Sequence, residues 1–456
     1  MKISFAVFLL LTLTLLLPGC AAPTPTPIPT NTPVPTATTV LPTETSVLTV
    51  IPTKLILPNN SVIREQCPEI APTFTPGEFT KGTLVVFPRF SNHQPFINLE
   101  TGDETSIKFG SRFFVSPSRS QIFYRTIDQN TLIWSWFIAT IGEVQPFKLS
   151  IPKTNWLIIR WFDDQRLAAR IYKNLPVDPP PHEIVILNPF SGEIKRLVPN
   201  LPNISQQEID WENLGPASYD QSLDYVLYAA WDDTANINMY VLYRISSGTK
   251  LAVLPGSSYS GSYLYDGQYM SVDGVSNNPP QWSFDGARVA LISTAPEKQV
   301  GVDEIFALTK DGEIQRLTYF ANHFDKAKIN NLSWSPDSKS IAFWVTLEPP
   351  PYQLSANAYQ DVRLAVLNTE TLEITVYCIS GDNIGLENGV PSPKFISEQI
   401  PAPIWSPDGM QIVVENRYAD DNSRLILLDI PSGKAVEIGK DIEPVGWMIS
   451  GLKQSR

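Results

Sequence analysis

The sequence predicts an all-β protein, a β-propeller of four-stranded blades, and three observations support this prediction. An aromatic residue followed by Ser, then Pro or Phe, then Asp and a small residue recurs at 282–286, 334–338 and 405–409. Each copy precedes an apolar strand. A second signature, an apolar strand that ends in a Gly turn, occurs between copies of the first, at 184–193, 305–313 and 425–434. A repeated unit of four short strands with these turns is typical of a propeller blade.

The Ser-Pro-Asp segment has the chemistry of a tight turn between the first two strands of a blade, strands a and b. Pro336 and Pro407 preset the backbone angle φ at the second turn position, and the Gly or Ser after Asp tolerates the left-handed conformation. We expect the Asp carboxylate to accept a hydrogen bond from a turn N–H. The preceding aromatic residue, such as Trp334, ends the innermost strand, where its ring fills the wedge between neighbouring sheets.

Weaker copies of the turn fill the intervals between the strong ones. They lie at 115–118, 161–164 and 217–220. All six units begin near residues 113, 159, 215, 280, 331 and 402. The segment 82–102 supplies strands b, c and d of a further blade without strand a, and the strand at 445–449 supplies the missing one. Pairing of the N- and C-terminal strands then closes the ring and removes exposed sheet edges. We therefore predict seven blades, with six or eight as alternatives.

These residues resemble the WD40-like, or PD40, β-propeller repeats of the TolB-like family over roughly residues 80 to 451. The resemblance rests on Trp-Ser-Pro-Asp at 334–337 and 405–408, and on Trp-Ser-Phe-Asp at 282–285. TolB-like propellers commonly have six blades, so the predicted seventh is a departure from the family. TolB-like relatives take part in envelope protein assemblies, and the resemblance therefore implies a protein partner in the cell envelope.

Residues 1–20 have the pattern of a bacterial lipoprotein signal peptide. Lys2 precedes an apolar run over 3–17, and the run ends in Leu-Pro-Gly-Cys, which resembles a lipobox with Cys20 as the lipidated residue. This run is shorter than the roughly 20 residues that a membrane span needs. We therefore expect an extracytoplasmic protein anchored by lipid to the bacterial cell membrane. An uncleaved helical anchor is the alternative.

Composition divides the rest of the chain into four segments. They are a disordered Pro/Thr-rich linker at 21–58, a lead-in segment at 59–81, the propeller at 82–451 and a tail at 452–456. The density of proline in the linker favours extended polyproline II. At roughly 3.1 Å per residue such a linker reaches about 100 Å. It would hold a folded head away from the bilayer.

The overall composition fits one large core and argues against a nucleic-acid partner. The chain has 456 residues, of which 43% are hydrophobic and 18% charged. Phosphate binding needs clustered Lys and Arg, whereas this chain has a formal net charge of −12 and no basic stripe. The sequence contains no metal-ligand spacing and no Gly-rich phosphate loop, so we predict neither a metal nor a cofactor. We expect a monomer.

Two cysteines remain once Cys20 is set aside. Cys67 lies just before the first blade, and Cys378 lies at the end of strand d of a late blade. Outside the cytoplasm such a pair forms disulfides. A bridge would staple the exit of the linker to the ring. Two unpaired structural cysteines are the alternative.

The long insertions of the propeller fall on a single face. Successive strands run antiparallel, so the b–c and d–a connections share one face and the short a–b and c–d turns share the other. The insertions occupy 174–181, 199–215, 256–280, 294–303, 347–360 and 380–403. One of them interleaves Ser and Gly with Tyr259, Tyr263, Tyr265 and Tyr269, and a neighbouring one carries Tyr352 and Tyr359. This composition suits recognition of a protein or saccharide, and packing of the loop on its own scaffold is the alternative.

Catalysis has weak support in the sequence. No Gly-x-Ser-x-Gly elbow is present, and we predict that His93, His182 and His323 are polar loop residues. Acidic pairs occur at 163–164, 232–233 and 420–421, but adjacent acids in a turn usually face water. We therefore predict a non-catalytic propeller that binds an envelope protein, a peptide or a glycan. A carbohydrate-active enzyme, a glycosidase or lyase with carboxylates around the ring's mouth, is the alternative.

Overall fold

The computed structural model describes most of the chain beyond residue 61. The described residues are 62–78, 81–88, 93–108, 110–128, 131, 134–141, 143, 145–149, 156–172, 182–197, 217–232, 237–255, 262–265, 268–271, 280–295, 302–348, 361–383, 386–387, 390–391, 401–417 and 423–450. Strands dominate them, with one 3-10 turn, η1 (Phe320–Asn322). Within these ranges no helix has the length and apolar character that crossing a bilayer requires. The predicted signal peptide and linker, Cys20 included, lie outside the described residues.

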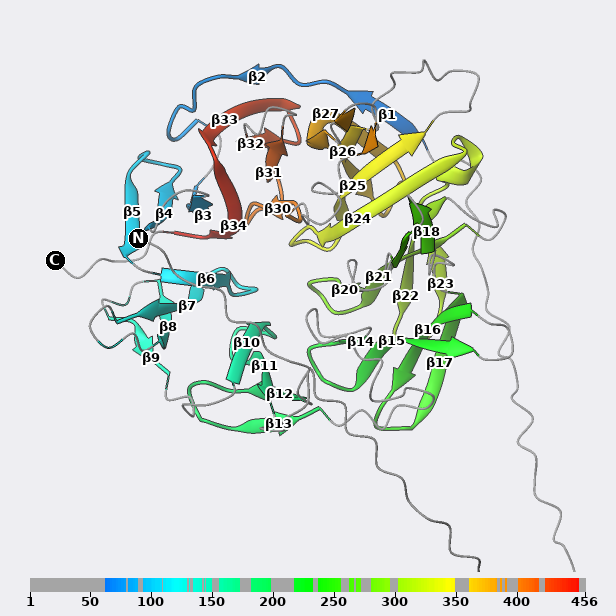
Figure 1. Ribbon diagram of the computed structural model, residues 1–456, viewed down its shortest axis with the longest axis horizontal. Coiled ribbons are helices and arrows are strands. Elements are labelled where there is room, and N and C mark those ends of the chain that lie inside the picture. The colour runs from blue at the N-terminus through cyan, green and yellow to red at the C-terminus, as the bar shows by residue number, and fades with distance from the viewer. Residues whose placement is uncertain are drawn as a thin grey trace, which may run out of the picture. The chain divides into compact units, whose positions relative to one another are not determined.

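Seven sheets surround a common centre, each with its first strand innermost (Figure 1). Blade 1 consists of β34 (Ile442–Met448), β3 (Thr83–Pro88), β4 (His93–Asn98) and β5 (Glu104–Lys108). Blade 2 consists of β6 (Gly110–Val115), β7 (Gln121–Ile127), β8 (Trp134–Thr140) and β9 (Phe147–Lys148). Blade 3 consists of β10 (Trp156–Trp161), β11 (Leu167–Tyr172), β12 (His182–Leu187) and β13 (Ile194–Arg196).

The other four blades repeat this order. Blade 4 consists of β14 (Ala217–Tyr219), β15 (Tyr225–Asp232), β16 (Ile237–Arg244) and β17 (Thr249–Pro255). Blade 5 consists of β20 (Gln281–Trp282), β21 (Arg288–Thr294), β22 (Asp303–Thr309) and β23 (Ile314–Arg316). Blade 6 consists of β24 (Lys326–Trp334), β25 (Ser340–Glu348), β26 (Asp361–Asn368) and β27 (Ile374–Asn383). Blade 7 consists of β30 (Ile404–Trp405), β31 (Gln411–Arg417), β32 (Ser423–Asp429) and β33 (Lys434–Lys440). The predicted seven-bladed propeller is confirmed.

Blade 1 joins the two ends of the propeller. The C-terminal β34 pairs antiparallel with β3, so that Leu84 lies opposite Trp447 and Thr83 opposite Met448. Trp447 and Met448 are buried. Gly82, with φ +114°, passes so close that a Cβ atom there would lie 2.4 Å from the carbonyl oxygen of Met448. The predicted closure by terminal strands is therefore confirmed.

The lead-in segment forms two strands that the sequence analysis missed. β1 (Ile63–Gln66) adds to the outer edge of blade 6 by pairing in parallel with β27. β2 (Ile70–Ala71) adds in the same way to the outer edge of blade 7, next to β33. Figure 1 shows both strands in blue along the outside of the ring. The segment from β1 to β2, called the strap below, thus covers two sheet edges that would otherwise be free.

Hydrogen bonds within the predicted a–b turns explain their recurrence. In blade 6 the Ser335 hydroxyl donates to Asp337 Oδ1 over 2.6 Å and accepts from the Ser340 N–H over 2.9 Å. Ser406 with Asp408 in blade 7, and Ser283 with Asp285 in blade 5, repeat the first contact over 2.5 Å. The residue after each Asp has a φ of 60° to 74°, as the turn chemistry predicts. The Asp therefore fixes the turn locally, with little help from the rest of the fold.

The tryptophans that end the inner strands of blades 3, 5, 6 and 7 link each of these blades to the one before it. Trp161 Nε1 donates to the carbonyl of Phe114 over 2.7 Å, and Trp334 Nε1 donates to that of Gln281 over 2.9 Å. Two further bonds of this kind run from Trp282 to Ser218 and from Trp405 to Ser333. The predicted wedge role is thus confirmed, and each indole also satisfies a backbone carbonyl of the neighbouring blade.

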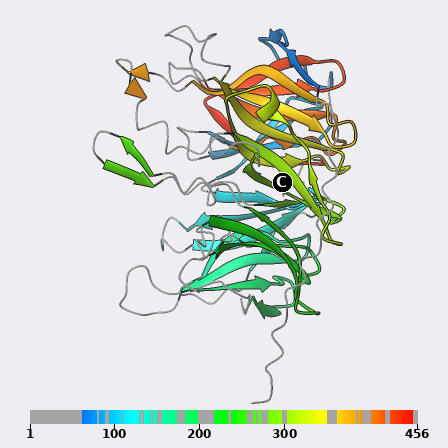
Figure 2. The same ribbon diagram turned by 90° about the vertical axis from the view of Figure 1, so that its right-hand side faces the viewer.

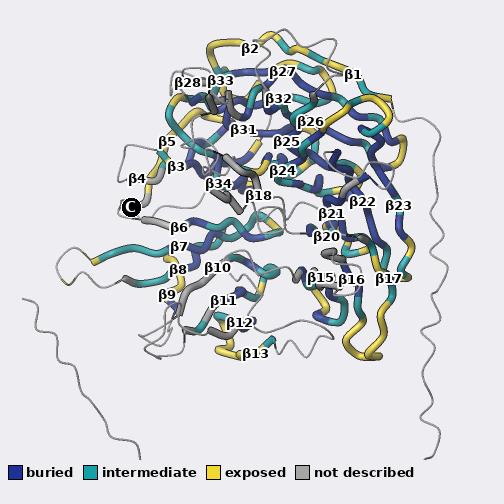
Figure 3. The backbone as a smooth tube through the Cα atoms, turned by 45° about the vertical axis from the view of Figure 1, so that its right-hand side comes forward, coloured by how far each residue is buried: buried dark blue, intermediate teal, exposed yellow. Residues whose placement is uncertain are grey.

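The hydrophobic core lies between adjacent sheets rather than at one centre. One cluster joins blades 5 and 6 through residues such as Phe320 and Phe343, and another joins blades 6 and 7 through Trp344 and Trp405. Figure 3 shows the buried stretches on the inner and middle strands and the exposed ones toward the outer edges. Because each blade is buried only by its two neighbours, the ring must close for every blade to be covered.

A buried ion pair fixes the outer half of blade 5 to η1. The Glu304 carboxylate accepts a hydrogen bond from Arg316 Nη2 over 2.7 Å, from the Thr318 hydroxyl over 2.5 Å and from the Ala321 N–H over 2.9 Å. Glu304 is 0% exposed and Arg316 is 4% exposed. The Arg316 guanidinium also stacks 4.5 Å from the centre of the Tyr319 ring. The carboxylate thereby gains three donors, which offset its removal from water.

We expect Glu304→Ala to lower the free energy of unfolding by about 3 kcal/mol, because it leaves the buried Arg316 without the carboxylate that faces it. Equilibrium denaturation in urea measures the change. Glu313→Ala, an exposed position on the same blade, is the matched control and should change stability by less than about 0.5 kcal/mol. Equal effects of the two substitutions would contradict this role of Glu304.

Candidate functional site

The insertion face, on which the b–c and d–a connections lie, carries two small hairpins. β18 (Ser262–Tyr265) and β19 (Gln268–Ser271) form one of them, in the connection from blade 4 to blade 5. β28 (Leu386–Glu387) and β29 (Val390–Pro391) form the other, in the connection from blade 6 to blade 7. Figure 2 draws both hairpins on the same side of the ring, as the antiparallel order of the strands requires.

Three of the predicted binding tyrosines come together in the first hairpin. Tyr263 pairs with Met270, Leu264 with Tyr269, and Tyr265 with Gln268. The structure therefore turns a tyrosine-rich loop of the sequence into a two-stranded element. Tyr259, Tyr352 and Tyr359 lie outside the described residues.

The histidines do not fit the predicted loop positions. His93 begins β4 and His182 begins β12, so both belong to the third strand of a blade. Both third strands begin earlier than the apolar runs at 97 and 184 predict, because polar residues extend each strand at its N-terminal end. His323 follows η1 and lies in a connecting segment, as predicted.

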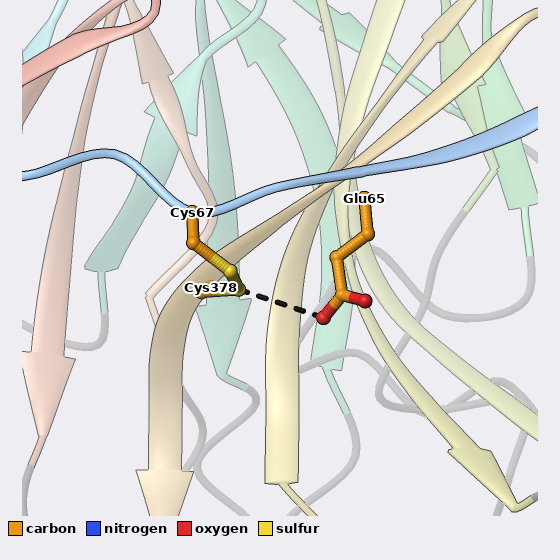
Figure 4. Close-up of side chains that lie close together, drawn as sticks. All are labelled: Glu65, Cys67 and Cys378. Atoms are coloured by element: carbon orange, nitrogen blue, oxygen red, sulfur yellow. Dashed lines mark hydrogen bonds between the residues drawn. A yellow bond between two sulfur atoms is a disulfide. The ribbon is translucent and has the colours of Figure 1, made fainter.

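Cys67 and Cys378 are joined in a disulfide, with a Cα–Cα distance of 4.6 Å (Figure 4). Cys67 directly follows β1 in the strap. Cys378 lies in the middle of β27 and not at the end of its strand, because β27 continues to Asn383. Glu65 lies beside the bridge and also contacts Arg363. Glu65 and the two sulfur atoms lie within 4.8 Å of one another, but bonded sulfurs are not the thiolates that a metal binds.

The face opposite the insertions, formed by the short a–b turns, carries a cavity of about 330 Å³. We call it the turn-face cavity. The residues around it include Val115, Pro117, Arg160, Trp161, Phe284 and Val445, together with the aromatic residues at 113 and 114. They come from blades 1, 2, 3 and 5, so the cavity lies where the inner strands and turns converge. A volume near 300 Å³ is at the lower end for small-ligand sites.

Three residues around this cavity depart from the repeat. Phe284 replaces the proline that Pro336 and Pro407 provide in the other two strong copies. Val115 stands where blades 3 and 5 to 7 end their inner strand with tryptophan and blade 4 with tyrosine. Because Val is smaller than an indole, it leaves space beside blade 2. Arg160 puts a charge directly before the tryptophan, where the other blades have an uncharged residue.

Two arginines near the turn face have perturbed electrostatics. Burial lowers the pKa of Arg160 to about 10, and its Nε is buried without a hydrogen-bond partner. Burial also lowers the pKa of Arg119 to about 10, which the charge of Asp408 partly opposes. Both remain cationic at neutral pH, so the fold holds two incompletely compensated positive charges in a protein that is acidic overall. Neither arginine was predicted as a site residue, although Arg160 stands out in the sequence as a break in the repeat.

Strand order and ring closure define the chain as a seven-bladed β-propeller. No protein-family model matches the chain, and no curated protein matches it. Solved structures do resemble it. TolB from Acinetobacter baumannii is 13% identical with a TM-score of 0.37, and the match covers 80% of this chain and 82% of that one.

Two further solved structures show the same degree of similarity. The β-propeller domain of the Trilobed protease from Pyrococcus furiosus is 13% identical with a TM-score of 0.45, covering 82% of this chain and 98% of that one. An oligogalacturonate lyase from Vibrio parahaemolyticus is 12% identical with a TM-score of 0.42, covering 78% and 86%. Similarity at this level concerns the propeller architecture, which the strand pairing shows directly.

Proposed function

We propose that this protein is an extracytoplasmic lipoprotein, anchored to the cell membrane, whose propeller is a non-catalytic scaffold that binds an envelope protein, a peptide or a glycan. The observation that carries the proposal is the structural difference between the two faces of one closed ring. Short hydrogen-bonded turns fix one face, whereas the other carries the insertions and both extra hairpins. Variable loops on a rigid scaffold are where binding sites concentrate.

The anchor rests on the N-terminal sequence. The lipobox-like segment at 17–20 and the Pro/Thr-rich segment after it suit a head held away from the bilayer. The strap supports this arrangement, because the chain enters the propeller through β1 and a disulfide that join it to blade 6. A mechanical force applied to the N-terminal segment would therefore act on blade 6 before it acted on blade 1.

One experiment tests both parts of the proposal. We expect the wild-type chain to sediment with membranes and Cys20→Ala to appear in the soluble fraction, with loss of incorporated radiolabelled palmitate. From detergent extracts the wild type should capture a specific envelope component, and replacing Tyr263, Tyr265 and Tyr269 by Ala should reduce its capture about tenfold or more, as the loss of central aromatic contacts does.

The control is replacement of Phe147 and Phe190 by Ala, two exposed aromatic residues, the first on the outer strand of blade 2 and the second in the turn between β12 and β13 of blade 3. Capture that survives the tyrosine substitutions unchanged would remove the hairpin from the proposal. Release of reducing ends from envelope glycans by the purified chain would contradict the non-catalytic part and favour the carbohydrate-active alternative.

A further inference from the structure

The turn-face cavity combines a mostly apolar wall with one cationic group. Apart from Arg160, the side chains around it are aromatic, aliphatic or proline. Arg160 extends from β10, next to a β-bulge between Ile158 and Arg160. A bulge re-aims the side chains that follow it, and such irregularities are frequent beside binding sites. This cavity lies on the face away from the hairpins and is a site distinct from the insertion face.

The charge of Arg160 lacks a fixed counterpart. Its Nε is buried without a hydrogen-bond partner, and the described residues form no ion pair with it. Asp408 acts on Arg119 and not on Arg160. Arg160 is half-buried, and its buried Nε without a hydrogen-bond partner costs stability, so an anion that enters the cavity would gain the hydrogen bonds that the fold leaves unmade. A planar guanidinium matches a carboxylate in a bidentate geometry.

The apolar lining of the turn-face cavity favours some carboxylate ligands over others. A uronic acid carries several hydroxyl groups, and each would need a hydrogen-bond partner on burial, whereas the wall is apolar except for Arg160. A peptide that ends in an apolar residue presents one carboxylate next to one apolar side chain. Trp161 and Phe284 supply rings for that side chain, and Arg160 supplies the cation.

We propose that the turn-face cavity binds the terminal carboxylate of a peptide whose last side chain is apolar, with Arg160 pairing the carboxylate and Phe284 covering the side chain. The two residues that make the site are both departures from the repeat. Phe284 is 39% exposed although it is a large aromatic residue, which suits a ring that becomes buried when a ligand enters. The peptide belongs to a partner chain, and the same protein can bind a different component through its insertion face.

The test uses isothermal titration calorimetry on the full chain carrying Cys20→Ala, with acetyl-Ala-Leu as the probe and its C-terminal amide as the comparison. We expect the acid to bind at least about tenfold more tightly than the amide, since a hydrogen bond between two charged groups is stronger than one to a neutral group. Arg160→Met should remove this preference and leave the weak binding of the amide unchanged. Arg64→Met, at an exposed position in the strap, should leave the preference intact.

Stability provides a second readout that a purely structural arginine would not give. At neutral pH the guanidinium is charged in both the folded and the unfolded chain, and its lowered pKa means that burial of the charge opposes folding. Arg160→Met should therefore raise the melting temperature by a few degrees without ligand, while it abolishes recognition of the carboxylate. If Arg160→Met does not fold, Arg160→Lys is the substitute. It keeps the charge but loses the planar guanidinium, so it should weaken binding of the acid and leave binding of the amide unchanged.

Phe284→Pro restores the residue of the other strong repeats and is the variant for the ring. It removes no backbone hydrogen bond of the turn, because the donors there are the Ser283 and Gly286 N–H groups. We expect this substitution to weaken binding of the acid and of the amide equally, while the melting temperature stays unchanged. Equal binding of acid and amide by the wild type, no binding of either, tighter binding of glucuronate, or an unchanged preference for the acid in Arg160→Lys would each overturn the proposal.

Discussion

Ending the chain after Asp441 should abolish cooperative folding. The deletion removes β34, the inner strand of blade 1, and with it the buried residues Trp447 and Met448. Loss of each such side chain costs about 2–5 kcal/mol, and the six paired positions along β3 lose their partners as well. The total is comparable to the whole stability of a typical domain, about 5–15 kcal/mol. Calorimetry should show no unfolding transition, and gel filtration should show aggregates.

The control for this truncation ends the chain after Ser450, which keeps all of β34. It should melt like the full chain. Trp447→Ala in the complete chain separates the loss of packing from the loss of strand pairing and should cost about 3–5 kcal/mol. A chain ending at Asp441 that melts at the wild-type temperature would show that the ring does not need its terminal strand, and the account of blade 1 would be wrong.

Removing the Cys67–Cys378 disulfide should produce the second largest loss. The bridge closes a loop of 311 residues, and the chain-entropy relation assigns such a loop about 6 kcal/mol. The strap's other fixed contacts are weaker, because ion pairs at exposed positions, such as Arg64 with Glu373 over 2.8 Å, contribute about 0–1 kcal/mol. We expect Cys67→Ala with Cys378→Ala to lower the melting temperature by about 5–15 °C.

Scanning calorimetry with and without dithiothreitol checks this expectation. Reductant should lower the melting temperature of the wild type to that of the double alanine variant and leave the variant unaffected. Limited proteolysis should cut the variant within the strap, because only the four backbone pairs of β1 and exposed ion pairs then hold that edge. Arg64→Ala is the matched control on the same strand. A wild-type melting temperature that dithiothreitol does not change would show that the bridge does not stabilise the fold.

Much of the fold follows from local chemistry and was therefore predictable. The Ser335–Asp337 contact and the left-handed residue after the Asp form a turn from five consecutive residues. The same turn at Ser406 and Ser283 repeats the unit, and alternating apolar strands between turns give blades. Six units and one incomplete blade make seven blades, and the ring closes once the strand at 445–449 is recognised as the missing inner strand. The strap was missed because β1 and β2 are four and two residues long and have no turn of their own.

The candidate sites were less predictable than the scaffold. Tyrosine-rich composition pointed to an insertion, and the structure gives it strand pairing between residues 262–265 and 268–271. The turn-face cavity escaped notice because its lining comes from four separate blades. Phe284 and Arg160 were nonetheless visible as departures from a repeat. In a repeat protein, a position that breaks the pattern therefore deserves the same weight as one that keeps it.

The sequence by itself determined the a–b turns and the four-strand repeat, because each depends on residues close together in the chain. The blade count and the closing strand followed from the repeat, since one blade lacked an inner strand and 445–449 supplied it. Only the tertiary structure decided which indole meets which carbonyl, where the strap lies, that Cys67 meets Cys378, and that Arg160 shares a cavity with Phe284. These contacts join residues from tens to hundreds of positions apart. Their energies depend on burial and distance, which no local pattern encodes.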